Sequence, residues 1–112
     1  MEAASTVAPA GTPQHMRALA EANRVRLARA ALKREIGDGK AEAADVARSC
    51  PWEVETMTVG ELLRSQRRWG RARARKFLFG LGLNENRDLG RLTERQRMVL
   101  AVALEAKSRG PA

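Results

Sequence analysis

Apolar residues recur at helical spacing along most of this chain, and no segment shows the alternation of a strand. From 13 to 36 the sequence is rich in Ala, Leu and Arg, which favours one long helix. Thr12 and Pro13 suit its start, and Gly37 suits its C-terminal cap. Its apolar stripe is narrow, so we expect much of this helix to be exposed. The stripe consists of Ala18, Val25, Leu32 and Ile36.

Two further helices are predicted before position 68. The first covers residues 41–49 and ends at Cys50, because a residue that precedes proline is disfavoured in helical geometry. The second begins at Thr58, an N-cap residue followed three positions later by Glu61, which is the pattern of a capping box. Met57 can pack on Leu62 across this start, and the helix is expected to run from 59 to about 67.

A break at Gly70 separates this helix from the next, which is expected over 71–79. Thr93 and Gln96 form a second capping box, for a last helix that reaches about Lys107. The expected core residues of these two helices are Ala74, Phe77, Leu78, Leu81, Val99, Leu100, Val102, Ala103 and Leu104. The fold class is therefore all-α, with a tail over 1–12 and a single domain over 13–109.

Composition narrows the range of partners. The 112 residues contain 21 Lys and Arg against 13 Asp and Glu, and 17 of the 21 are Arg, so the net charge is +8. Such an excess indicates a polyanionic partner. Aromatic residues are only 4% of the chain, too few for a sheet platform that stacks single-stranded bases.

The chain offers little for metal or redox chemistry. Cys50 is the only cysteine and His15 the only histidine, so neither an internal disulfide nor a Cys/His zinc site can form. No apolar run is long enough to span a bilayer, and the N-terminus lacks the pattern of a signal peptide. We expect a cytoplasmic monomer without cofactor.

One segment concentrates positive charge without any acid. Between positions 64 and 76 lie seven basic residues, namely Arg64, Arg67, Arg68, Arg71, Arg73, Arg75 and Lys76. A solvated helix face, which is the alternative explanation, normally mixes both signs. The predicted helix that starts after Gly70 adds unpaired backbone N–H groups and the positive end of its dipole. A phosphate can bind at this place. We expect Gly70 to take a conformation that a side chain hinders, because the backbone must approach that phosphate.

The residues around this turn resemble a known motif. Trp69-Gly70 followed by Ala74 is similar to the hairpin of the helix-two-turn-helix family, and Gly82 to Arg87 resembles the rest of that module. With the long basic helix and the segment 57–63, residues 21–105 most resemble the actinobacterial integration host factors. Arg68 stands where the family has a glycine. Either the turn is distorted, or Arg68 adds a phosphate contact.

The resemblance implies a function and a site. It implies a module over 58–107 that binds double-stranded DNA without catalysis or marked sequence preference, in the nucleoid, with help to a site-specific recombinase as a further hypothesis. Because a ribosomal small-subunit protein shares the module, structured RNA is the alternative ligand. Trp69 either packs on the core or wedges between bases, and Arg87 and Arg91 either hold phosphate or are solvated. The DNA-binding residues expected are the seven basic residues together with Trp69, Gly70, Arg87 and Arg91.

Overall fold

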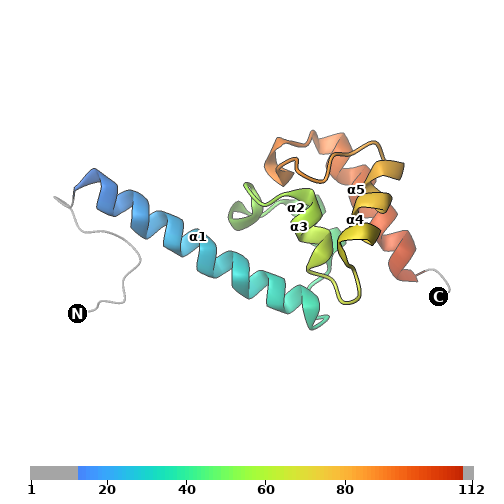
Figure 1. The fold of residues 1–112 in the computed structure, drawn as a ribbon, viewed down its shortest axis with the longest axis horizontal. Helices are drawn as coiled ribbons and strands as arrows, with labels where there is room; N and C mark the ends of the chain where they lie inside the picture. Colours follow the sequence, from blue (N-terminus) through green and yellow to red (C-terminus); the bar gives the residue numbers. More distant parts are fainter. Residues whose placement is uncertain (1–12, 110–112) are drawn as a thin grey trace.

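The computed structural model describes residues 13–109, which form five α-helices and two 3-10 helices (Figure 1). The α-helices are α1 (Gln14–Gly37), α2 (Ala43–Ser49), α3 (Val59–Arg64), α4 (Arg71–Gly80) and α5 (Glu94–Arg109). The 3-10 helices are η1 (Trp52–Val54) and η2 (Leu89–Arg91). Over these residues there is no strand, only an isolated antiparallel bridge between Thr58 and Asp88. The all-α prediction is confirmed.

The ends of the helices differ from the prediction by a few residues. Pro13 is the N-cap of α1, and Thr12, the expected cap, lies outside the described residues. Gly37 remains inside α1, and the residue with left-handed backbone is Gly39, at a φ of +79°. α3 ends at Arg64, earlier than expected, because the backbone N–H groups of Ser65 and Gln66 bond the carbonyl groups three residues back, those of Leu62 and Leu63, instead of four residues back.

The core lies among the helices that follow α1, where α2 packs on α5 and α3 packs on α4. Its largest fully buried side chains are Met57, Leu62, Leu63, Leu78, Leu89, Leu100, Val54 and Val59. α5 buries Leu100 and Leu104, which are four residues apart on one face. Val99 and Val102 lie on the opposite face and are 45% and 52% exposed, so their expected burial is wrong. Phe77 and Leu81 are half-buried at the edge of the core.

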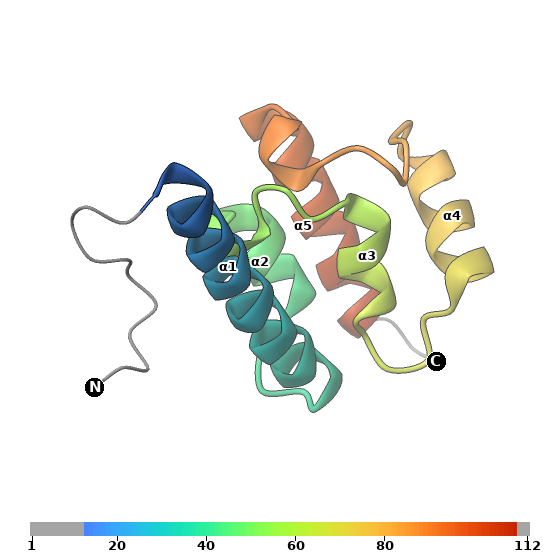
Figure 2. The same ribbon diagram turned by 60° about the vertical axis from the view of Figure 1, so that its left-hand side comes forward.

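The long helix α1 extends beyond the other helices, which gives the molecule dimensions of 54 × 27 × 22 Å. In Figures 1 and 2, α1 and α4 lie on opposite sides of the molecule with α3 between them. Ile36 is the only buried residue of α1. The expectation that this helix is largely exposed is therefore confirmed.

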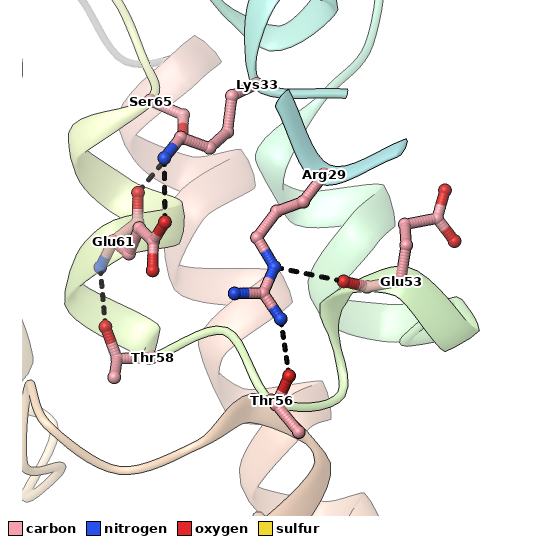
Figure 3. Close-up of polar contacts among 7 residues, drawn as sticks. All are labelled: Arg29, Lys33, Glu53, Thr56, Thr58, Glu61 and Ser65. Carbon is pink, nitrogen blue, oxygen red and sulfur yellow. Dashed lines mark hydrogen bonds and ion pairs between the residues drawn. The ribbon is translucent and has the colours of Figure 1, made fainter. Parts of the chain in front are cut away.

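Polar side chains attach α1 to the segment that precedes α3 and to α3 itself (Figure 3). Arg29 Nε donates to the carbonyl oxygen of Glu53 at 3.2 Å, and its Nη2 donates to Thr56 Oγ1. Lys33 Nζ lies 2.7 Å from Glu61 Oε2. The Thr58 hydroxyl accepts from the backbone N–H of Glu61 at 3.1 Å, as expected for an N-cap. The Glu61 carboxylate, however, bonds Lys33, so only half of the predicted capping box is present.

Candidate nucleic-acid interface

The segment from Arg64 to Gly70, called here the basic turn, reverses the chain between α3 and α4 (Figure 2). Ser65 Oγ donates to the carbonyl oxygen of Glu61 at 3.0 Å, and Gln66 Nε2 donates to that of Leu63 at 3.1 Å. Trp69 N–H then donates to the carbonyl oxygen of Gln66 at 3.2 Å. The turn is therefore held by its own backbone and by short polar side chains, which leaves its arginines outside the hydrogen bonds that shape it.

Arg68 has left-handed backbone, with a φ of +68°. Non-glycine residues rarely adopt this conformation because Cβ crowds the following carbonyl group. The position that departs from the helix-two-turn-helix pattern is therefore the one that requires a glycine-like conformation. Arg68 adopts this conformation although it is not a glycine, and its side chain is exposed to solvent.

Gly70 differs from the prediction. We expected a conformation that a side chain hinders, but its φ of −85° and ψ of −178° are extended and open to any residue. A Cβ atom at this position would meet no heavy atom within 4 Å. The glycine is thus not needed for the turn's conformation, and what it provides is open space in front of the first residue of α4.

The N-terminus of α4 is available to an anion. Gly70 is the N-cap, and no side chain of the described residues caps the helix there. The N–H groups of the first helical turn have no intrahelical acceptor, and the helix dipole places partial positive charge beside them. Arg71, the first residue of α4, is exposed at the same place. The predicted phosphate site therefore has both backbone donors and a cation.

All seven basic residues between Arg64 and Lys76 are exposed. Two of them already contact neighbours within the described chain. Arg75 Nε lies 2.9 Å from Glu85 Oε2, and the Arg73 guanidinium lies 4.1 Å from the centre of the Trp69 ring. The other five make no ion pair with any acidic residue among positions 13–109, so their charge is uncompensated locally.

Trp69 is half-buried and packs against the edge of the core. Its ring meets Phe77 edge-on, with centroids 5.2 Å apart and planes at 88°. Arg73 covers one face of the indole. Of the two roles considered for Trp69, this packing favours a structural one, because a wedge between bases needs a projecting ring.

A second turn, from Gly82 to Arg87, joins α4 to η2. Gly82 has a φ of +74°, and the Asn84 side chain accepts from the N–H of Asn86 at 2.8 Å. Arg87 Nη2 donates to the carbonyl oxygen of Arg91 at 3.4 Å. Arg87 and Arg91 line one shallow depression of about 360 Å³. The structure thus brings these two predicted residues together.

The second turn is attached to the first residues of α3. Val59 and Gly60 donate their N–H groups to the carbonyl oxygens of Arg87 and Glu85, each at 2.9 Å. A Cβ on Gly60 would lie 3.0 Å from the Glu85 carbonyl oxygen, so only glycine allows this approach. Because the basic turn follows the other end of α3, the two turns lie at opposite ends of that short helix (Figure 2). Arg87 and Arg91 are therefore not part of the phosphate site at Gly70.

No pattern in the sequence indicates the contacts that fix these turns. Glu85 forms an ion pair with Arg75, and Gly60 leaves room for the second turn, yet neither residue stands out in the sequence.

Cys50 ends α2 with a φ of +45°, and burial raises the pKa of its thiol. None of the helices over 13–109 is long and apolar enough to cross a membrane. In the same residues no three His, Cys, Asp or Glu side chains cluster as metal ligands would.

No protein-family model matches the chain, and no curated protein matches it. Among solved structures, one of sIHF, the actinobacterial integration host factor, bound to an 8-base-pair palindromic DNA matches with a TM-score of 0.67. The two are 26% identical, and the match covers 75% of this chain and 97% of sIHF. The chain therefore has the sIHF-like fold that the sequence resemblance implied.

Proposed function

We propose that this chain binds double-stranded DNA through its phosphates as a non-enzymatic, nucleoid-associated protein. The observation that carries the proposal is the group of exposed arginines around the uncapped N-terminus of α4. The similarity of this chain to sIHF, whose solved structure includes DNA, supports the same conclusion. Phosphate contacts supply most of the affinity of such proteins and make it depend on salt.

Each part of the basic turn has a distinct task in this proposal. Backbone N–H groups at the start of α4 bind one phosphate, and the open space at Gly70 lets that phosphate approach. Arg67 and Arg71 are exposed and can bind phosphate oxygens with their planar, two-pronged guanidinium groups. Arg87 and Arg91 provide a second contact at the other end of α3.

Little sequence preference is expected of this surface. Direct readout requires side chains free to reach base edges in a groove. On α4, Arg73 is stacked on Trp69 and Arg75 is paired with Glu85, so both are occupied within the protein. The remaining cations suit the phosphate backbone, which carries no base code. Location in the cytoplasmic nucleoid and assistance to a recombinase are extensions of this proposal.

The first test is the dependence of duplex affinity on salt. If about six phosphates are neutralised, affinity should fall by about three orders of magnitude between 50 and 200 mM salt. A flat response would contradict the proposal. Competition between the duplex and a structured RNA of equal length, at one salt concentration, separates DNA binding from the ribosomal-protein alternative. Preference for the RNA would favour that alternative.

The second test locates the site with paired substitutions. Replacing both Arg67 and Arg71 by Ala should weaken binding to unrelated duplexes equally and lower the salt slope by about two. The matched control replaces Arg95 and Lys107, two exposed cations of α5, and should leave duplex affinity nearly unchanged. Equal losses in both variants would mean that net charge, rather than the basic turn, determines binding.

The third test separates backbone from side chain in the basic turn. Gly70→Val fills the open space without straining the extended backbone, so the variant should fold normally, and its affinity for duplex DNA should fall about tenfold or more.

Arg68→Gly restores the glycine of the family pattern. If backbone donors dominate, its affinity should be unchanged, whereas a weaker affinity would assign a phosphate contact to the Arg68 side chain. Normal binding by Gly70→Val would place the phosphate elsewhere.

A further inference from the structure

A groove with an apolar floor lies between α4 and the C-terminal part of α5. Its volume is about 440 Å³, and Trp69, Phe77 and Leu81 form its floor. The rim carries Arg73 and Lys76 from α4 and Lys107 from α5. These six side chains give an apolar surface surrounded by cations.

The groove continues past Leu81 into a second depression of about 180 Å³. Leu83 and Val99 add apolar surface there, and Arg95 adds another cation. Val99 is the residue that the helical pattern assigned to the core, and it is 45% exposed here. No acidic residue among the described part of the chain lines either depression.

This combination identifies the chemistry of an occupant. The phosphate backbone of a duplex is matched by the cations of the rim, but it offers no apolar surface to the floor. An acidic segment whose apolar side chains recur on one face would match both features, with its carboxylates against the rim and its apolar side chains on the floor. We propose that the groove between α4 and α5 binds an acidic amphipathic segment of a partner protein.

This docking site is separate from the phosphate site proposed at Gly70, although it takes Arg73 and Lys76 from the same helix. Lys107 and Arg95 line the groove and are not among the residues predicted to bind DNA. Peptide binding can therefore be measured without DNA, and its failure would leave the proposed DNA binding untouched.

The experiment uses the full chain carrying Trp52→Phe, so that Trp69 is the only tryptophan. Trp52 is 46% exposed and lies outside the groove. The probe is a synthetic peptide of about 14 residues, enough for a helix of about 20 Å, with Glu at most positions and Leu at i, i+4 and i+7. Saturable change in Trp69 emission is the expected result, and its absence would overturn the proposal.

Two control peptides and two protein variants test the specificity of the groove. Replacing Leu by Ser, or Glu by Gln, in the peptide should weaken binding about tenfold, since both surfaces contribute. Lys107→Glu should weaken the original peptide about fivefold, whereas Arg17→Glu, on the exposed surface of α1, should not. If the Leu-to-Ser peptide, or the Lys107→Glu variant with the original peptide, binds as tightly as before, the groove is not the peptide-binding site. If Lys107→Glu loses affinity for duplex DNA, the groove binds DNA instead.

Discussion

Helices α1 and α5 have similar compositions, rich in Ala, Leu and Arg, yet the structure uses them differently. α5 places Leu100, Ala101 and Leu104 in the core, each at most 3% exposed. α1 is longer, with 24 residues, and buries only Ile36. The difference follows from spacing, since neighbours at i, i+1 and i+4 make a broad apolar face, whereas residues seven apart make a narrow one.

The two helices are therefore held by different forces. α5 is fixed by apolar burial and by an ion pair in which Arg48 Nη1 lies 3.0 Å from Glu105 Oε2. α1 buries Ile36 at its C-terminal end and is otherwise attached through polar groups, with Arg29 and Lys33 as donors and Arg24 stacked 4.3 Å above the Trp52 ring. Exposed polar contacts contribute little free energy and are screened by salt. Apolar burial thus determines the fold, and α1 is an attachment to it.

The largest effect is expected in the core face of α5. Leu100→Ala removes a fully buried side chain and should lower the free energy of unfolding by about 3 kcal/mol. Val102→Ala, at a position 52% exposed, is the matched control and should change it by no more than about 0.5 kcal/mol. Chemical denaturation of both variants measures the difference. Similar losses would show that the exposed face of α5 is covered in the native protein.

A smaller effect is expected at the helix starts. Thr93 and Gln96 exchange two hydrogen bonds of 2.9 and 3.0 Å at the start of α5, which is the complete capping box predicted from sequence. Thr93→Ala should therefore cost about 1 kcal/mol of unfolding free energy. No side chain of the described residues caps α1, so Gln14→Ala at its first position should have almost no effect. Equal losses of unfolding free energy in Thr93→Ala and Gln14→Ala would show that the starts of α1 and α5 are stabilised to the same extent.

These capping residues show which parts of the fold the sequence could predict. Caps, terminators and turns depend on neighbours within four residues, so the starts of α3, α4 and α5 were predicted correctly. The Glu61 carboxylate was not, because Lys33, 28 positions away, competes for it. The expected burial of Val99 failed for a similar reason, since which face of α5 is covered depends on how the helices pack.

The candidate site was predictable to a similar degree. The basic turn could be predicted from the sequence, because a run of cations without acids is evident there without knowledge of the fold. The sequence could not show that Arg75 is paired with Glu85 or that Arg73 is stacked on Trp69, since both contacts form only after the chain folds. Nor could it show that Arg87 and Arg91 lie away from the basic turn, because that depends on which end of α3 each turn adjoins.

The smallest effect is expected where α1 is attached. Replacing both Arg29 and Lys33 by Ala removes its polar contacts with Glu53, Thr56 and Glu61, and should cost only about 0.5 kcal/mol of unfolding free energy. Hydrogen exchange of α1 amides should nevertheless become faster relative to those of α5, because α1 then keeps only its apolar contacts at Leu32 and Ile36 while the core stays intact. The control double variant, Arg17→Ala with Arg34→Ala, removes the same charge from exposed positions of α1 and should leave exchange unchanged. A loss as large as that of Leu100→Ala, with α1 and α5 exchanging together, would show that α1 is as much a part of the cooperative core as α5.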